Sequence, residues 1–263
     1  MSDAHLKVNA VGKSFAVKGG DIIDAVRNVT FDVQANEFCM LLGPSGCGKS
    51  TILRMIAGLE TPTSGQIILN GQRIVGPDRD RGMVFQNYTS FDWLTVEQNV
   101  EYGMRINNVA EAERKQRARE YIDLVHLTKF KDAYPRQLSG GMKQRVAIAR
   151  TLANQPNLLL MDEPFGALDA ETRWSMQELM LSIMEKTSTT VVMVTHDIEE
   201  ALFLGDRIIF ISRHPGTVLE DIQVDYRKGQ DIKRKEDAVT SPGYAELEHH
   251  IIGLMRSQAH SAD

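Results

Sequence analysis

The stretch that decides the fold is Gly43-Pro44-Ser45-Gly46-Cys47-Gly48-Lys49-Ser50. It follows the apolar run 38–42 and precedes a helical pattern, so we expect a loop between a strand and a helix. Glycines let such a backbone curl until successive N–H groups surround an anion. Lys49 and Ser50 suit phosphate oxygens and Mg²⁺, and the helix adds the positive end of its dipole. The stretch predicts a phosphate-binding loop for a nucleoside triphosphate, although GTPases, kinases and motors share that loop.

Length and composition limit the alternatives. The 263 residues are 42% hydrophobic, enough for one large α/β domain or a core with a smaller subdomain. A net charge of -5 without a continuous basic stripe makes nucleic acid a poor candidate partner. A disulfide between Cys39 and Cys47 would distort the loop, so a reducing, cytosolic compartment is expected. We find no apolar run of roughly 20 residues and no signal core, so we expect a soluble chain that is not exported.

The first 74 residues have mostly strand patterns. Alternating Val29, Phe31 and Val33, and an Asn70-Gly71 turn signal, predict antiparallel strands beside the phosphate-loop sheet. Phe15 lies in this region. An aromatic ring near the nucleotide can stack on adenine, but Phe15 is equally consistent with an ordinary core or edge residue.

The period becomes helical between Thr95 and about Ala153, which predicts a helical insertion in an α/β sheet. Tyr88, Phe91 and Trp93 lie just before it, in a segment without a clear period. Bulky apolar groups in a connection suggest a docking surface, and packing against a local subdomain explains them with similar ease.

Polar side chains end three predicted strands. Asp162 and Glu163 follow the apolar run 158–161, and Asp162 is placed to hold Mg²⁺ while Glu163 polarises a water. Gln86 and His196 end two further strands. A lone histidine is usually structural, but the helix signal after His196 fixes it at the end of its strand. Since open α/β sheets bind ligands at the carboxyl ends of their strands, we expect these groups to converge on one phosphate.

Two later segments complete the pattern. Leu138-Ser139-Gly140-Gly141 opens a helix, and it is either a second anion site or an ordinary helix cap. Residues 225–237 are polar and predict a solvated connector, before a final amphipathic helix that begins near Tyr244.

Taken together and in this order, these motifs resemble the nucleotide-binding subunit of ABC transporters over residues 6 to about 215. The resemblance implies an α/β fold: a P-loop NTPase core with a mostly parallel sheet, an N-terminal antiparallel β subdomain and an inserted α-helical subdomain. We expect an ABC ATPase domain over 1–225, with the helical insertion at about 88–153, and a C-terminal connector and helix over 226–263.

The resemblance also implies ATP and Mg²⁺ as cofactors, and ATP hydrolysis as the reaction. In it, Glu163 is the general base, while Gln86 and His196 contact the γ-phosphate. The nucleotide-binding candidates are Phe15, Gly43, Pro44, Ser45, Gly46, Cys47, Gly48, Lys49, Ser50, Thr51, Ser139, Gly140, Gly141 and Asp169; the metal candidates are Ser50, Gln86 and Asp162.

In that family two subunits pair head to tail, so a second copy or a related cassette is an expected partner. The resemblance implies that Ser139, Gly140 and Gly141 close the partner's nucleotide site and that Asp169 lines the seam. Met142 departs from the family pattern, which often has glutamine there. Despite this departure, the Ser139 hydroxyl and the backbone N–H groups can still donate hydrogen bonds.

Transmembrane permease subunits are further expected partners, docking near the loop after Gln86, and a periplasmic or lipoprotein solute-binding protein is an indirect one. This implies a peripheral place on the cytoplasmic face of the bacterial inner membrane. Stretches 77–86, 93–100 and 213–216 look most like the nitrate, sulfonate and taurine importers. The alternatives are a soluble ABC ATPase of DNA repair or translation, which usually carries coiled-coil insertions or tandem cassettes, and a non-hydrolysing module, against which Glu163 argues.

Overall fold

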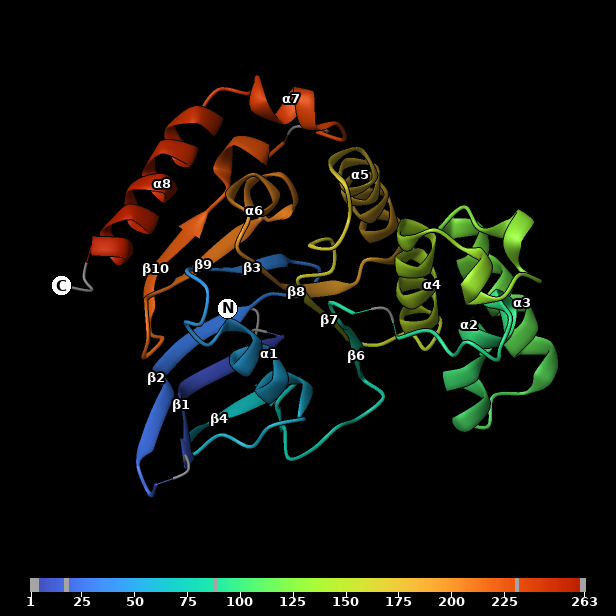
Figure 1. The fold of residues 1–263 in the computed structure, drawn as a ribbon, viewed down its shortest axis with the longest axis horizontal. Coiled ribbons are helices and arrows are strands. Elements are labelled where there is room, and N and C mark those ends of the chain that lie inside the picture. Colours follow the sequence, from blue (N-terminus) through green and yellow to red (C-terminus); the bar gives the residue numbers. More distant parts are fainter. Residues whose placement is uncertain (1–4, 17–18, 88, 230–231, 261–263) are drawn as a thin grey trace. The chain divides into compact units, whose positions relative to one another are not determined.

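The computed structural model describes residues 5–16, 19–87, 89–229 and 232–260. The chain forms two compact units (Figure 1). One combines residues 1–78 with 190–263 and is called the terminal unit below; the other, residues 79–189, is called the central unit. Tyr88, one of the three aromatic residues singled out above, lies outside the described residues.

The terminal unit contains an antiparallel sheet of order β2-β1-β4-β5. Its strands are β1 (Leu6–Ala16), β2 (Ile22–Val33), β4 (Ser64–Leu69) and β5 (Gln72–Arg73). Val29, Phe31 and Val33 are buried, as their alternation predicts. The turn between β4 and β5 has positive φ angles at Asn70 (49°) and Gly71 (77°), which a tight hairpin requires. The predicted N-terminal antiparallel sheet is confirmed.

The terminal unit also holds four adjacent strands in the order β10-β9-β3-β8. β3 (Phe38–Leu42) pairs in parallel with β8 (Thr190–Thr195) and β9 (Arg207–Ile211), and all three are buried throughout. β10 (Val218–Gln223) adds an antiparallel edge. The helices of this unit are α1 (Lys49–Ala57), α6 (Ile198–Leu204), α7 (Lys235–Val239) and α8 (Tyr244–His260), with a 3-10 turn, η3 (Asp225–Arg227).

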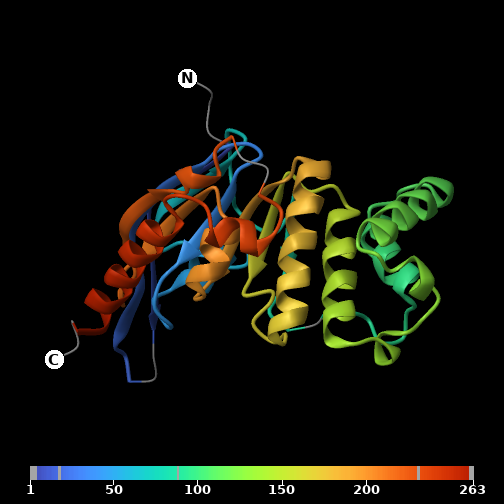
Figure 2. The same cartoon turned by 90° about the horizontal axis from the view of Figure 1, so that it is seen from above.

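The central unit pairs β6 (Arg81–Val84) in parallel with β7 (Leu158–Asp162). The strand expected over 82–86 therefore ends at Val84. Its helices are α2 (Val96–Ile106), α3 (Glu111–Leu124), α4 (Gly140–Leu152) and α5 (Ala170–Thr187), with short turns η1 (Thr128–Phe130) and η2 (Pro135–Gln137). Figure 2 shows α4 between α5 and the pair formed by α2 and α3. The predicted α/β class with a mostly parallel second sheet is confirmed.

An ionic cluster surrounds the buried Arg207 at the start of β9. The guanidinium binds Asp221 through two hydrogen bonds, lies 3.3 Å from a carboxylate oxygen of Asp32 and lies 3.7 Å from one of Glu37. Arg207 is only 9% exposed, and its hydrogen bonds to Asp221 raise its pKa further. Burial raises the pKa of Glu37, and the nearby Arg207 guanidinium acts in the opposite direction. The cluster joins β2, β9 and β10.

The prediction of a solvated connector over 225–237 is wrong in part. Tyr226 is buried, its hydroxyl donates to the carbonyl of Leu202 at 2.7 Å, and its ring meets that of Tyr244 edge to face. Burial raises the pKa of Tyr226 to about 12. Ile232 is buried as well. Polar residues surround Tyr226 and Ile232 in the sequence, so the local pattern does not show that these two side chains are buried.

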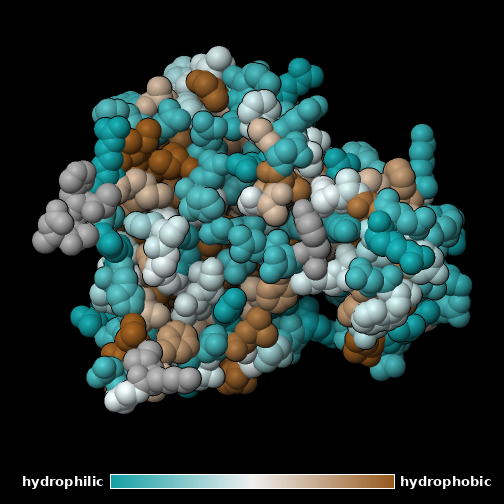
Figure 3. Space-filling view, in the orientation of Figure 1, coloured by the Kyte–Doolittle hydropathy of each residue, from teal (hydrophilic) through white to brown (hydrophobic). Residues whose placement is uncertain are grey.

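The surface is mostly polar on the face that Figure 3 shows, with apolar residues scattered over it. Within the described ranges, no helix combines the length and the apolar character that crossing a bilayer requires.

Candidate nucleotide site

The phosphate loop connects β3 to α1, as predicted. Gly48 has a φ of 100°, and a Cβ there would lie 2.4 Å from Cγ1 of Val26 and 2.9 Å from the carbonyl oxygen of Ala25. Both the backbone angle and the space therefore require glycine. α1 has no side-chain N-cap and no acidic residue in its first turn. No side chain caps the helix start that the loop presents to an anion.

A second segment supports the loop from behind. A Cβ on Gly216 would lie 2.0 Å from the carbonyl oxygen of Cys47. Gly216 is held there by two backbone bonds: its N–H donates to Ala25 at 3.1 Å, and its carbonyl accepts from Arg27 at 2.9 Å. Sequence reasoning noticed residues 213–216 only as a likeness to one group of importers. These residues are far from the loop in the sequence, so no local pattern reveals that the two are in contact.

Lys49 is the first residue of α1 and is 5% exposed. Its ammonium donates to the carbonyl oxygens of Gly43 at 2.7 Å and Pro44 at 2.9 Å, so it is held over the loop. Cys47 is buried beside it, and burial raises the pKa of that thiol, which keeps it uncharged. Both cysteines are free thiols. The ammonium is thus the one cationic side chain that the loop itself supplies.

We expect Lys49→Ala to weaken ATP binding by about tenfold or more, because a charge-assisted contact to phosphate is lost. Fluorescence titration with a labelled ATP analogue measures the dissociation constant. Lys7→Ala, on β1, is the matched control for the loss of one lysine charge. An unchanged affinity in Lys49→Ala would contradict this role of the loop.

His196 and Phe15 are the other candidates in the terminal unit. β3 and β8 run in parallel with Leu42 opposite Thr195, so Gly43 and His196 leave adjacent strands at the same end. His196 is exposed there, ahead of Asp197, which caps α6 by accepting from the N–H of Glu200. Phe15 is 38% exposed on β1, with the Lys13 ammonium 4.9 Å from its ring centre. Adenine stacking by Phe15 stays a prediction.

The central unit brings Gln86 and Glu163 together. They follow the parallel strands β6 and β7, and Nε2 of Gln86 lies 3.5 Å from Oε2 of Glu163. Glu163 has a φ of 44°, a left-handed conformation that costs a non-glycine residue about 1–3 kcal/mol and that concentrates at active sites. Asp162 is the last residue of β7 and is 8% exposed. Within this unit the strand ends thus bring Gln86 and Glu163 together, while their convergence with His196 and the phosphate loop stays a prediction.

Ser139 is the N-cap of α4. Its hydroxyl accepts from the N–H of Met142 at 3.3 Å, which agrees with the helix-cap alternative and still leaves the hydroxyl proton free to donate. A Cβ on Gly141 would lie 2.5 Å from Cγ2 of Thr172 on α5, so α4 and α5 meet closely here. Asp169 caps α5, and its hydrogen bond from the N–H of Thr172 lowers its pKa.

A cavity of about 490 Å³ opens beside Ser139 in the central unit. It is also lined by three charged or titratable residues that sequence reasoning missed, namely His126, Arg145 and Glu171. They come from the end of α3, from α4 and from α5, and no motif links them in sequence. Ser139 and Gly141 therefore face an open, polar hollow.

The fold and the loop together define a P-loop nucleotide-binding protein. The family model described as "ABC transporter" matches residues 26–166. The nitrate import ATP-binding protein NrtD of Synechocystis is 48% identical over 97% of this chain and 96% of its own. The taurine import ATP-binding protein TauB of Rhizobium johnstonii is 44% identical over 96% and 97%. A dimeric, post-hydrolysis ATP-binding cassette with ADP and Pi matches 83% of this chain and 98% of its own, at 37% identity and a TM-score of 0.73.

This chain belongs to the ABC transporter family and is one of its ATP-binding subunits, an ATPase.

Proposed function

We propose that this chain is the ATP-hydrolysing subunit of a bacterial importer for a small anion, such as a sulfonate, taurine or nitrate. The observation that carries the hydrolytic role is the arrangement at the ends of β6 and β7, where a strained glutamate lies beside Gln86. Relatives that are import ATP-binding proteins for nitrate and taurine support the cargo class. The chain works peripherally, on the cytoplasmic face of the membrane.

In this proposal the phosphates lie against the loop and the start of α1, where Lys49, Ser50 and Thr51 contact them. Glu163 takes the proton of the attacking water, and Gln86 orients that water and the γ-phosphate. His196 contacts the γ-phosphate from the end of β8. Ser139, Gly140 and Gly141 serve the nucleotide of a second cassette, with Asp169 at the seam.

The donor chemistry fits Mg²⁺. Asp162 offers a nearly buried carboxylate, Ser50 a hydroxyl and Gln86 an amide oxygen, all of them hard oxygen donors. Among the described residues, no group of three or more His, Cys, Asp and Glu side chains forms a metal cage. Nucleotide-bound Mg²⁺ is ordinarily held by one or two carboxylates together with phosphate oxygens and waters, and Asp162 is the carboxylate proposed here. When bound, Mg²⁺ supplies positive charge to the phosphate oxygens.

An aromatic groove in the central unit supports a permease as partner. The rings of Phe91 and Tyr102 lie 4.3 Å apart, and Trp93 is 5.4 Å from Phe91 and 72% exposed. The buried Asn99 fixes this segment by hydrogen bonds to both the N–H and the carbonyl of Phe91. The adjoining cavity of about 460 Å³ is lined by Phe91, Tyr102 and Arg150. A surface of aromatic rings beside arginine suits a helix of a membrane protein.

We expect Trp93→Ala to weaken association with the permease at least tenfold, because exposed tryptophans are frequent anchors of interfaces. Tagged chain is purified from its native host in mild detergent, and the copurified membrane protein is quantified by mass spectrometry. Trp174→Ala, an exposed tryptophan on α5, is the matched control. Recovery of ribosomes or DNA in place of a membrane protein would favour the soluble ATPase, and growth of a deletion strain on nitrate, taurine or sulfonates tests the cargo.

A further inference from the structure

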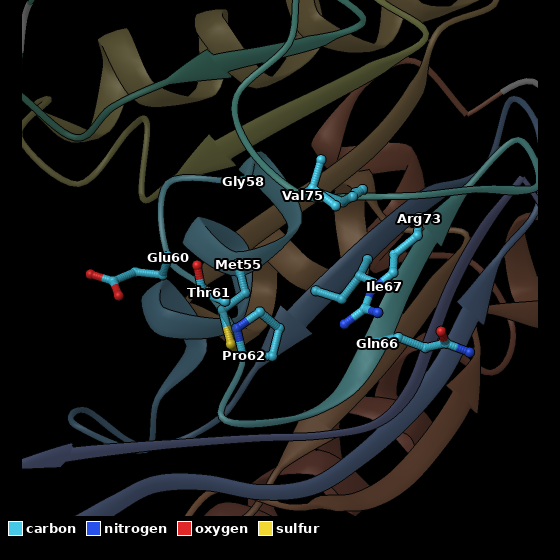
Figure 4. Close-up of a pocket in the computed structure, with 10 residues that line it drawn as sticks. Met55, Gly58, Glu60, Thr61, Pro62, Gln66, Ile67, Arg73 and Val75 are labelled. Atoms are coloured by element: carbon cyan, nitrogen blue, oxygen red, sulfur yellow. The ribbon is translucent and has the colours of Figure 1, made fainter.

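A small cavity in the terminal unit lies apart from the phosphate loop, at the opposite end of α1 (Figure 4). Its volume is about 110 Å³. Its apolar side is formed by Met55 on α1, Pro62, Ile67 on β4 and Ile74 after β5, and the exposed Val75 lies at its rim. Since a dry cavity of about 150 Å³ holds benzene, this one holds a ligand of about four or five non-hydrogen atoms.

One cation faces this apolar wall. The backbone of Arg73 is fixed by its pairing with Ile68, and Ile74 donates to the carbonyl of Ile67 at 2.9 Å. In Figure 4 the Arg73 guanidinium extends toward Ile67 and Gln66. In the part of the chain that the structure describes, the side chain of Arg73 has no ion pair and no hydrogen bond. Its donors are therefore available to a ligand.

The acidic residue that lines this cavity already forms an ion pair with another cation. Glu60 also lines the cavity, but its carboxylate pairs with the Lys13 ammonium at 3.0 Å. Figure 4 shows this carboxylate pointing away from Arg73. Lys13 also donates to the carbonyl of Thr61 at 2.9 Å, which holds the 60–61 turn in this arrangement. The positive charge of Arg73 is thus not compensated from within the cavity.

We propose that this cavity binds a short-chain alkyl monocarboxylate of the size of propionate. The planar guanidinium fork matches a carboxylate through two parallel hydrogen bonds. The alkyl chain then lies along the half-buried Pro62 and Ile74, above the buried Met55 and Ile67. An inorganic oxyanion satisfies the guanidinium but leaves the apolar wall uncovered, and a neutral amide of the same shape covers the wall but loses the charge. The proposal does not depend on which solute the transporter carries.

The experiment titrates sodium propionate into the full chain labelled with ¹³C at its methionine methyl groups. We expect the Met55 resonance to shift and saturate with a dissociation constant of about 1 mM. The methyl of Met40, buried on β3, is the reference that should not move. The shift should persist in protein saturated with ADP, because the phosphate loop is then occupied.

Arg73→Gln should weaken propionate binding about tenfold, and propionamide should bind wild type about tenfold more weakly than propionate does. Arg27→Gln, which removes the same charge from β2, should bind propionate like wild type. An unmoved Met55 resonance, or an equal response in Arg73→Gln, overturns the proposal. Loss of the shift with ADP places the anion in the phosphate loop, and an equal saturating shift with sodium nitrate shows an adventitious ion only; either result also overturns it.

Discussion

Glu163→Gln is expected to lower ATP hydrolysis by about 100- to 10,000-fold, the usual contribution of a general base. The substitution keeps the length of the side chain and its contact with Gln86, so ATP binding should change little. With binding intact and turnover lost, the pair of cassettes should accumulate in its ATP-bound form. Steady-state phosphate release measures the first effect, and size-exclusion chromatography with light scattering in ATP measures the second.

Glu185→Gln is the matched control, because it removes an exposed carboxylate from α5. It should hydrolyse ATP like wild type. If Glu163→Gln releases phosphate at the normal rate, Glu163 is not the base. If its rate falls but ATP affinity falls equally, the substitution has disturbed the site and has not isolated the proton transfer.

Arg207→Ala is expected to lower the free energy of unfolding by about 3 kcal/mol, because it leaves partly buried carboxylates facing one another without their cation. Arg207→Lys should recover part of the loss, since an ammonium keeps the charge but cannot make the paired bonds to Asp221. Urea unfolding followed by circular dichroism gives the midpoints.

The control for this substitution is Arg27→Ala, which breaks an exposed pair with Asp24. Such pairs contribute little, so its midpoint should stay near that of wild type. Equal midpoints for Arg207→Ala and wild type would show that the cluster does not stabilise the terminal unit.

Much of the candidate site follows from local sequence. The phosphate loop needs glycine at position 48, because of both the backbone angle and the space there. The order of strand, loop and helix around it can be recognised from the sequence alone. The acids at the end of β7 and the glutamine after β6 are predictable because parallel strands end at one edge of a sheet. The hairpin at Asn70-Gly71 is equally local.

Other features depend on contacts between residues that are far apart in the sequence. The spacing of apolar residues along the chain does not reveal such contacts. In the sequence, Arg207 is one polar residue at the start of a strand. Its three carboxylates come from β10, from the end of β2 and from Glu37, just before β3, and only the folded chain brings them together. Tyr226 reads as part of a polar connector and is buried by contacts with Leu202 and Tyr244. The residues around Ser139 converge from separate helices for the same reason.

The backbone bonds of Gly216 to Ala25 and Arg27 have a consequence for synthesis on the ribosome. The loop, between Gly43 and Ser50, is translated well before Gly216, which packs against it. A nascent chain that stops short of residue 216 carries the complete motif without its support. We therefore expect a nascent chain to bind nucleotide more weakly until residue 216 has been synthesised and can support the loop.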